Sequence, residues 1–436
     1  MFGTAQELLD YVQACTSPCH TVAVSAERLE QAGFRELFLP DAWTLERGGR
    51  YYVKAYDSTL LAFVIGSRPG GMRIAAAHTD FPCLRLKPEA GLEREGYGLL
   101  NVESYGGMIL RSWLDRPLSL AGKLVLRGKD AFHPETRLVD FGRPLLTVPS
   151  LAIHMDREVN EKGELNCQKD MLPLAMLLPR ALEVEGGEGV EDSCRENFFL
   201  EWLSDEFMVS SRDILSYELS AYPAEEGCVM GFGEEFISSP RLDNLTSAKA
   251  CLEGILAAKP EEGLRLVALF DHEEVGSRTK QGAGSGLLMQ ALGRIYRALS
   301  GGGEDLFSDL AEGFMLSVDV AHGLHPGHPD KSDPAVRPVL GGGVVLKQAA
   351  GQSYAGDAQA VAVVRSICEE HEIPWQHFVN RSDSKGGSTL GAIASALLSV
   401  RTMDVGAPIL AMHSARELMG AEDQRSLEQL LKAFMG

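Results

Sequence analysis

Two histidines and three carboxylates in this chain stand where an α/β protein would place metal ligands. Four of them follow apolar segments that predict strands: His78 after 73–77, Glu274 after 264–270, Asp319 after 314–318 and His413 after 408–412. Asp243, in the string SPRLDN at 239–244, follows a Gly-rich turn rather than a clear strand. Open α/β sheets bind ligands beyond the carboxyl ends of their strands. We therefore predict a metal site along one edge of a sheet.

The types of these side chains indicate the metal. Imidazole and carboxylate suit divalent zinc, and cobalt or manganese could take the same places. Five ligands exceed what one tetrahedral zinc ion needs, and they match two ions that share one bridging carboxylate. Two metals about 3.5–4 Å apart are a known device of aminopeptidases, where they polarise a carbonyl and lower the pKa of a water.

The acidic doublet Glu273-Glu274 predicts hydrolysis rather than binding alone. Two neighbouring residues cannot easily face the same metal, so one can ligate while the other acts on the water as a general base. Asp80, two residues after His78, is placed to accept the other ring N–H of His78 and to fix its tautomer. For any one of these residues a satisfied polar side chain is the commoner explanation, but the set together favours metal binding.

The elements around these residues alternate between helix and strand at both ends of the chain. Apolar spacing predicts helices at 5–15 and 24–33 and paired strands at 51–55 and 60–65. From about 235 the predicted order is helix 247–258, strand 264–270, helix 284–299, strand 313–319, helix 357–371, strand 376–379, helix 386–399, strand 408–412 and helix 422–434. This alternation predicts an α/β fold with a mostly parallel sheet and helices on both faces.

Residues 90–234 have a different character. Short β-like runs such as 118–126 dominate, and the Glu- and Gly-rich stretch 183–197 is predicted to be a loop. The simplest organisation is one catalytic α/β domain made from residues 1–89 and 235–436, interrupted by a β-rich domain at 90–234.

Composition bounds the class of protein. The 436 residues are 45% hydrophobic, which is enough for a large core, and the formal net charge of -20 argues against nucleic acid and anionic membranes. No apolar run reaches the roughly 18 residues that span a bilayer, and the first residues lack the features of a signal peptide. Eight irregularly spaced cysteines predict reduced thiols and a cytoplasmic location. Cys15, Cys19 and His20 lack the second half of a zinc-binding pattern.

Longer segments around the same residues resemble the aspartyl aminopeptidase family of dinuclear metallopeptidases. The resemblance spans nearly the whole chain, and its motifs are highly specific in combination. They are AAHTDFPCLRLKP at 76–88, NVESYGG at 101–107, WLDRPLSLAG at 113–122, SPRLDNL at 239–245, DHEEVGS at 271–277, DVAH at 319–322 and AMHSARE at 411–417.

The resemblance implies a role for each site residue. Asp243 would bridge two zinc ions, and Glu273 would be the base. The remaining ligands would be His78 and Asp319 at one zinc ion and Glu274 and His413 at the other. The family also implies a tetrahedral dodecamer built from dimers, with the β-rich insertion as the dimerisation domain.

Two further residues take a role from the resemblance. Lys347, after the glycines at 341–343 and an apolar strand, stands where the family keeps a lysine for an acidic substrate side chain. His154, in LAIH at 151–154, resembles a histidine that reaches a neighbouring subunit's active site, although a satisfied loop histidine explains it equally well. His272 stands where Asn is common, and residues 382–385 differ from the usual loop before 387–389. These differences bear on substrate preference more than on chemistry.

The sequence therefore predicts a peptidase that releases an N-terminal residue, Asp or Glu, from peptides. The alternatives are a related broad-specificity or deblocking metallo-aminopeptidase and, outside the enzymes, a metal-stabilised assembly protein with an inactive site. All six expected ligand and base residues are present, which favours an enzyme.

Overall fold

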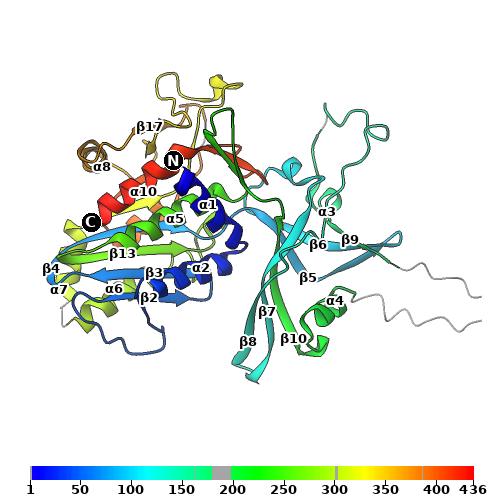
Figure 1. Ribbon diagram of the computed structural model, residues 1–436, viewed down its shortest axis with the longest axis horizontal. Helices are drawn as coiled ribbons and strands as arrows, with labels where there is room; N and C mark the ends of the chain where they lie inside the picture. Colours follow the sequence, from blue (N-terminus) through cyan, green and yellow to red (C-terminus); the bar gives the residue numbers. More distant parts are fainter. Residues whose placement is uncertain (1, 162, 179–197, 300–302, 385) are drawn as a thin grey trace, which may run out of the picture. The chain divides into compact units, whose positions relative to one another are not determined.

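The computed structural model describes the chain except residues 1, 162, 179–197, 300–302 and 385, so the predicted loop at 183–197 lies outside the described residues. The chain forms two compact units (Figure 1). Unit 1 combines residues 1–81 with 227–436, and unit 2 comprises residues 82–226. These limits fall somewhat before the expected domain boundaries at 89/90 and 234/235. The assignment of one domain to catalysis and the other to dimerisation stays a prediction.

Unit 1 is built around a nine-stranded mixed sheet. Its strands, in spatial order, are β1 (Arg35–Glu36), β2 (Arg50–Ala55), β3 (Thr59–Ile65), β13 (Glu262–Phe270), β4 (Arg68–His78), β14 (Phe314–Val318), β18 (Arg401–Gly406), β16 (Val344–Gln348) and β17 (Trp375–Val379). The four central strands, β13, β4, β14 and β18, are parallel to one another, while β3 and β16 run antiparallel to them. The predicted α/β class is confirmed.

The central strands are mostly apolar and buried because both faces of the sheet are covered. Successive side chains of a strand point to opposite faces, and in β4 Ile74 and Ala76 join one core while Ala75 and Ala77 join the other. Helices lie on both faces in Figure 1. The first core includes residues of α1 (Phe2–Ala14), α2 (Pro18–Gln31), α5 (Leu242–Ala257), α8 (Ala358–Glu370) and α10 (Ala421–Met435); the second includes residues of α6 (Leu287–Ala298), α7 (Gly303–Glu312) and α9 (Leu390–Leu398).

A second, five-stranded sheet also belongs to unit 1. Its spatial order is β11 (Cys228–Met230), β12 (Phe236–Ser239), β20 (Glu417–Gly420), β19 (Pro408–Leu410) and β15 (Ala321–His322). The central strand β20 is antiparallel to both of its neighbours. The sequence did not predict β12, whose four residues FISS are too few for a periodic pattern.

Unit 2 contains a six-stranded sheet in which every neighbouring pair is antiparallel. Its order is β8 (His133–Asp140), β7 (Leu118–Asp130), β10 (Ile214–Pro223), β5 (Cys83–Arg94), β6 (Tyr97–Tyr105) and β9 (Leu174–Leu177). The short helices α3 (Cys167–Asp170) and α4 (Phe198–Phe207) accompany it.

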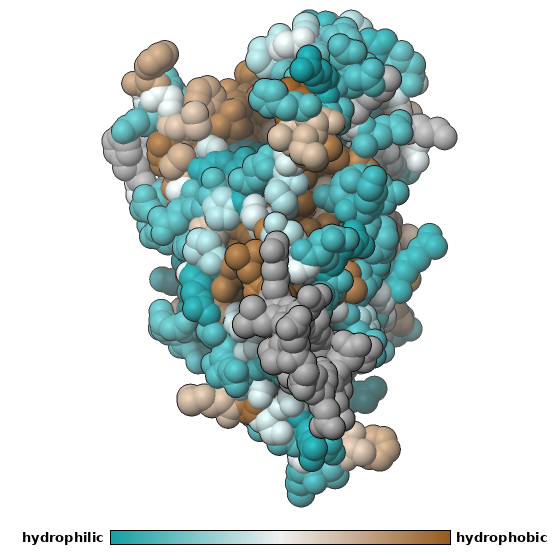
Figure 2. All heavy atoms as spheres, turned by 90° about the vertical axis from the view of Figure 1, so that its right-hand side faces the viewer, coloured by the Kyte–Doolittle hydropathy of each residue, from teal (hydrophilic) through white to brown (hydrophobic). Residues whose placement is uncertain are grey.

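Several large apolar side chains of unit 2 are exposed, with Phe132 and Met208 each 92% accessible. Figure 2 shows one face of the molecule on which apolar residues gather in patches among hydrophilic ones. Among the described residues no helix combines the length and the apolar character needed to cross a membrane.

Candidate metal centre

The predicted ligands come together at strand ends of both sheets of unit 1. His78 ends β4, Asp319 follows β14, and Glu274 lies in the single turn η4 (Glu273–Val275) just after β13. Asp243 follows β12, and His413 follows β19, so these two come from the five-stranded sheet. The prediction of one sheet edge is therefore wrong for them. Two sheets meet at the site, and a short strand was not recognisable before Asp243.

The Asp243 carboxylate lies between the two imidazoles. Its Oδ1 is 3.5 Å from His78 Nε2, and its Oδ2 is 3.3 Å from His413 Nε2. His78 Nε2 is also 3.6 Å from Asp319 Oδ1, and His413 Nε2 is 3.5 Å from Glu274 Oε2. The side chains thus form two groups that share Asp243, namely His78–Asp243–Asp319 and Asp243–Glu274–His413.

These separations suit a cation better than direct hydrogen bonds. N–H···O hydrogen bonds are mostly about 2.9–3.0 Å long, whereas ligand atoms about 2.1 Å from a tetrahedral zinc ion lie about 3.4 Å apart. Two buried carboxylate oxygens in the described part of the site, Asp243 Oδ1 and Glu274 Oε1, accept no hydrogen bond. The donor set therefore fits two zinc ions that share the Asp243 carboxylate.

The doublet at 273–274 is held by Asp80, which is fully buried. The backbone N–H groups of Glu273 and Glu274 each donate to a different oxygen of the Asp80 carboxylate, both at 3.1 Å. His78 Nδ1 lies 2.9 Å from the Asp80 backbone oxygen and 3.3 Å from Oδ1. Asp80 can thus hold the His78 ring, with its backbone oxygen as the nearer acceptor, while its carboxylate binds the backbone of the doublet.

The backbone explains one departure from the family pattern. His272 has a left-handed conformation, with φ of 63°. Asn, Asp and His are the non-glycine residues enriched in that region. The exchange of Asn for His therefore keeps the turn that presents the doublet.

A third possible ligand group, His78–Glu273–Glu274, overlaps the other two.

Without a cation the cluster carries strongly perturbed carboxyl groups. Burial raises the pKa of Glu273 to about 8, with His78 opposing and the Asp319, Asp80 and Asp243 carboxylates adding to the rise. Burial and the Asp243 carboxylate raise the pKa of Glu274 well above its usual value. Burial alone would lower the pKa of His78, but the surrounding carboxylates outweigh it and the pKa is raised. Bound cations would reverse the repulsion that raises the carboxyl pKa values.

The sequence prediction missed Glu417, which begins β20. The Glu417 side chain is 2% exposed and accepts the backbone N–H groups of Asp243 at 3.0 Å and of His413 at 2.7 Å. Burial and the Asp243 carboxylate raise the pKa of Glu417 to about 8. In the sequence, Glu417 could have been recognised as an acidic residue that ends the AMHSARE motif and begins the otherwise apolar string ELMG.

Lys347 lies in β16 with only 1% of its surface exposed. Its Nζ donates to the Val320 backbone oxygen at 3.1 Å and lies 3.5 Å from Asp319 Oδ2. Gly343 directly precedes this strand with φ of +90°, and a Cβ atom there would lie 2.1 Å from the Pro374 oxygen, so the position requires glycine. The cation of Lys347 is therefore next to the cluster and already paired with protein acceptors.

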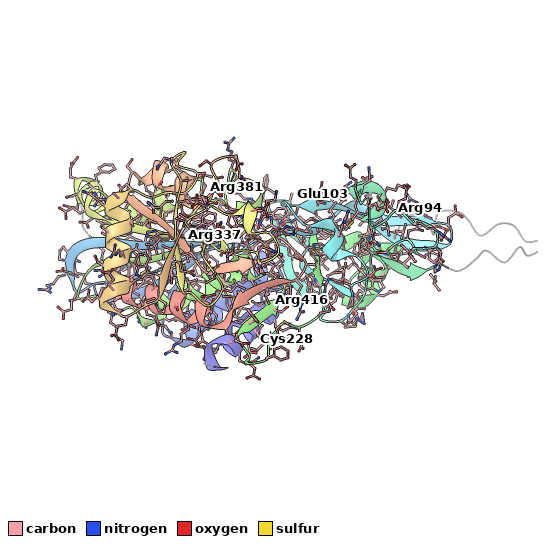
Figure 3. All side chains as sticks on the ribbon, turned by 90° about the horizontal axis from the view of Figure 1, so that it is seen from above. Arg94, Glu103, Cys228, Arg337, Arg381 and Arg416 are labelled. Atoms are coloured by element: carbon pink, nitrogen blue, oxygen red, sulfur yellow. The ribbon has the colours of Figure 1, made fainter. Side chains whose placement is uncertain are left out.

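Other described residues considered in the sequence belong to none of these possible ligand groups. His154 is exposed in a turn of unit 2 and belongs to none of the possible metal groups of the described residues. In the loop 382–385, Asp383 pairs with Arg381 (labelled in Figure 3) through two contacts of 2.7 Å, while Lys385 lies outside the described residues. Cys15, Cys19 and His20 likewise form no metal group in the described part of the chain.

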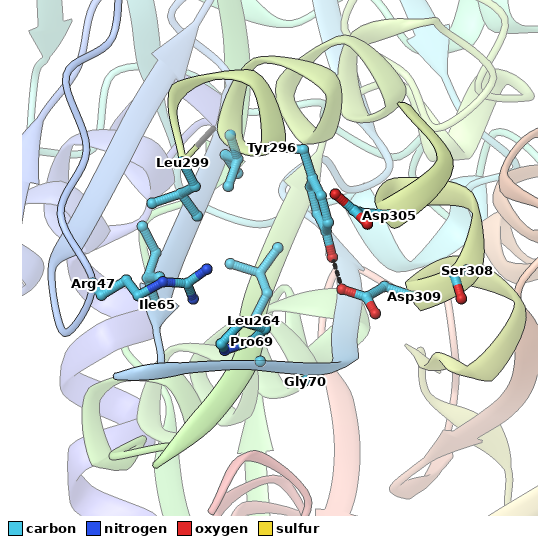
Figure 4. Close-up of a pocket in the computed structure, with 12 residues that line it drawn as sticks. Arg47, Ile65, Pro69, Gly70, Leu264, Tyr296, Leu299, Asp305, Ser308 and Asp309 are labelled. Atoms are coloured by element: carbon cyan, nitrogen blue, oxygen red, sulfur yellow. Dashed lines mark hydrogen bonds between the residues drawn. The ribbon is translucent and has the colours of Figure 1, made fainter. Parts of the chain in front are cut away.

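A pocket of about 310 Å³ lies at the opposite ends of the same strands (Figure 4). Its lining includes Pro69 and Gly70 from the start of β4 and Gly263 and Leu264 from the start of β13. Tyr296 donates a hydrogen bond to Asp309 beside it. None of the predicted ligands lines this pocket, so it is separate from the metal centre.

Comparison with known proteins gives a consistent result. Residues 11–435 match the family model described as aminopeptidase I zinc metalloprotease (M18). The chain is 41% identical over 434 residues to the probable M18 family aminopeptidase 2 of Clostridium acetobutylicum, covering 99% of this chain and 98% of that protein.

Solved structures are also similar. A chain of the Ape4 and Nbr1 complex superposes with a TM-score of 0.93 at 33% identity, covering 99% of this chain and 85% of that one. A chain of the S. cerevisiae mApe1 dodecamer superposes with a TM-score of 0.83 at 25% identity, covering 99% and 96% respectively.

Proposed function

The chain belongs to the aminopeptidase I zinc metalloprotease (M18) family, and from this premise we propose that it releases N-terminal acidic residues from peptides with two zinc ions and a Glu273 base. Membership makes it a zinc-dependent aminopeptidase, a hydrolase. The number of metals, the base and the acidic preference are the finer parts of the proposal. The observation that supports two metals is the Asp243 carboxylate, with one oxygen facing each imidazole.

Each zinc ion would take one histidine, one further carboxylate and one oxygen of Asp243. His78 and Asp319 would hold one ion, and Glu274 and His413 the other. Bound zinc supplies a Lewis acid that polarises the scissile carbonyl and lowers the pKa of the attacking water.

Glu273 would move the proton. Peptide cleavage expels an amine, which leaves readily only when its nitrogen is protonated. Glu273 would take a proton from the attacking water and deliver it to the leaving nitrogen. Its doublet partner Glu274 lies 3.5 Å from His413 through Oε2, which leaves Glu273 as the member free for proton transfer. The Asp80 carboxylate accepts both backbone N–H groups of the doublet. It would thereby hold Glu274 toward His413 and leave Glu273 available for proton transfer.

The first test replaces Glu273 with Gln, which keeps the size of the side chain and removes the base. We expect turnover to fall by at least about 100-fold, the lower end of general-base effects, with zinc content unchanged. Turnover near that of the wild type would refute the role of Glu273, and loss of zinc would make it a ligand instead.

The acidic preference rests on Lys347. A Lys cation attracts a carboxylate, and Lys347 is buried beside Asp319 with two protein acceptors for its three N–H donors. Replacing Lys347 with Met should lower kcat/KM for an N-terminal Asp reporter more than for an Ala reporter. An equal loss for both reporters would assign Lys347 to the support of Asp319 alone.

A panel of aminoacyl reporter substrates separates the proposal from its rivals. A preference for Asp and Glu supports it, whereas a preference for Leu or Ala favours a broad-specificity or deblocking aminopeptidase. A protein with two bound zinc ions and no peptidase activity would instead favour the metal-stabilised assembly protein.

We also propose a cytoplasmic homo-oligomer, a dodecamer built from dimers, in which His154 reaches a neighbouring active site. The S. cerevisiae relative forms a dodecamer, unit 2 exposes large apolar side chains, and Cys15, Cys167, Cys228, Cys251 and Cys368 form no disulfide among the described residues. A mass in solution of about twelve times the 47.3 kDa chain is expected. A monomeric mass would refute this part.

A further inference from the structure

The strands of the five-stranded sheet bring one acidic residue to the junction of two proposed ligands. β20 lies between β12 and β19 and is antiparallel to both. The carboxyl ends of β12 and β19, which lead to Asp243 and His413, therefore meet the amino end of β20. Glu417 is the first residue of β20 and pairs in register with Ser239, the last residue of β12.

Glu417 bonds to the backbone of both ligands. Its Oε2 accepts the N–H of Asp243 at 3.0 Å, and its Oε1 accepts the N–H of His413 at 2.7 Å. Both ligands have irregular backbone: Asp243 departs from helical geometry within α5, and His413 has φ of 66°. Neither backbone N–H is therefore committed to a regular helix or sheet, and the Glu417 carboxylate is the acceptor for both.

The neighbouring Arg416 anchors the start of β20. Its Nε donates to Ser238 Oγ at 2.9 Å, and its Nη2 donates to the Ser238 backbone oxygen at 3.1 Å and contacts Cys228 Sγ at 3.3 Å. Figure 3 shows Arg416 and Cys228 near each other. These contacts attach the segment before Glu417 to β12 and leave its carboxylate little freedom to move.

We propose that Glu417 is a positioning residue of the metal centre, which sets the spacing of Asp243 and His413 through their backbone N–H groups. The inference rests on the proposed two-zinc function. Glu417 matches Asp80, whose carboxylate accepts the N–H groups of Glu273 and Glu274. Together the two buried carboxylates contact the base and four of the five proposed ligands, namely Glu273, Glu274, His78, Asp243 and His413.

The geometry explains why spacing matters here. Asp243 faces both imidazoles at 3.3–3.5 Å, so a shift of its backbone changes both ligand groups at once. Partners that orient metal ligands typically contribute 10–100-fold to metal affinity. We therefore expect Glu417 to act on zinc binding first and on turnover through it.

The test replaces Glu417 with Gln, so that an amide NH₂ must oppose one of the two backbone N–H groups. Zinc affinity is measured by competition between the zinc-free protein and a chromophoric chelator. We expect a 10–100-fold loss of affinity and a kcat that falls at limiting zinc and recovers as zinc is raised. Glu428→Gln is the matched control, because Glu428 is also a buried acid of unit 1 but bonds to Lys249 rather than to the cluster. Its zinc affinity should equal that of the wild type.

A second variant covers the case in which Glu417→Gln does not fold. Glu417→Asp keeps the charge but is one methylene too short to reach both N–H groups, and it should also weaken zinc binding and alter the visible spectrum of the cobalt-loaded protein. Wild-type zinc affinity in the folded variants would overturn the role of Glu417 alone. A wild type that binds fewer than two zinc ions would overturn the proposed function as well.

Discussion

Replacing Asp243 should reduce the total free energy of zinc binding about twice as much as replacing one of the other proposed ligands does. The structure places one Asp243 oxygen in each ligand group, whereas Asp319 belongs to the His78 group only. We compare Asp243→Ala with Asp319→Ala, which make the same chemical change. Asp243→Ala should weaken both zinc ions, and Asp319→Ala should weaken one and leave the other at nearly its wild-type affinity.

The size of the effect follows from the free energy of a zinc–ligand bond. Four-ligand zinc sites bind with about 10–16 kcal/mol, so one ligand corresponds to roughly 3–4 kcal/mol. That loss is about 100–1,000-fold in affinity. Zinc stabilises the folded state by RT ln(1 + [Zn]/Kd) per site. At a fixed zinc concentration the loss of zinc-induced stabilisation should therefore be about twice as large for Asp243→Ala as for Asp319→Ala.

The assay titrates the zinc-free proteins against a chelator of known affinity, with elemental analysis for stoichiometry and urea unfolding with and without zinc. Each variant is compared with its own zinc-free form, because Asp243 also acts without zinc: burial raises its pKa, but the His413 and His78 imidazoles outweigh burial and lower the pKa below its usual value, so the ionised carboxylate stabilises the zinc-free protein. The bridging assignment fails if Asp243→Ala keeps one wild-type site, or if Asp319→Ala loses both.

Three further predictions concern the metal, a buried ion pair and a buried acid. Removing zinc with a chelator should abolish peptidase activity and lower the Tm, and both should return with added zinc; activity that survives complete removal would contradict the zinc mechanism. Lys249 is fully buried with Nζ 2.7 Å from Glu428 Oε1, so Lys249→Met, which removes the cation nearest to that buried carboxylate, should cost about 3 kcal/mol in urea unfolding, the lower end for a broken buried pair because Gln424 Nε2 still donates to Glu428 Oε1. The double variant Lys249→Met/Glu428→Gln should recover part of the unfolding free energy that Lys249→Met loses. If the losses of the two single variants simply add in the double variant, the two side chains do not interact. Burial raises the pKa of Asp423 to about 7; since the folded state then holds the proton more tightly, the wild type should gain about 2–3 kcal/mol relative to Asp423→Asn between pH 8 and pH 5. A difference in unfolding free energy that stays constant over this range would refute the shift.

The sequence predicted best those elements whose local pattern matches their surroundings. The strand expected at 264–270 is β13 (Glu262–Phe270), and the helix expected at 357–371 is α8 (Ala358–Glu370). The run 266–270 of β13 is apolar because it is covered on both faces. The central strand β18 was missed because its sequence RTMDVG contains a polar run and a buried carboxyl, Asp404. Local hydrophobicity cannot predict a strand whose polar groups find their partners only in the folded chain, as Asp404 Oδ2 does by accepting the backbone N–H of Ala355.

The site residues were predictable by type, because metal ligands need imidazole and carboxylate at strand ends. Their grouping was not. The pattern around His413 does not reveal that its strand pairs with β20 in a separate sheet, and that pairing brings Glu417 to the cluster. Nor does the apolar context of Lys347 reveal that its Nζ already binds the Val320 oxygen. Strand order and register decide both, and these depend on contacts between distant segments.

The central place of β4 has a consequence for how the protein is made. β4 comes from the first piece of unit 1 but lies between β13 and β14 of the second piece, so paired residues such as Ala76 and Ala268 are separated by the whole of unit 2. Contacts so distant in sequence form slowly. During synthesis unit 2 can fold before the strands that pair with the first piece of unit 1 have been made. His78 meets the other ligands only after the second piece arrives, so the loading of zinc belongs to the last stage of folding.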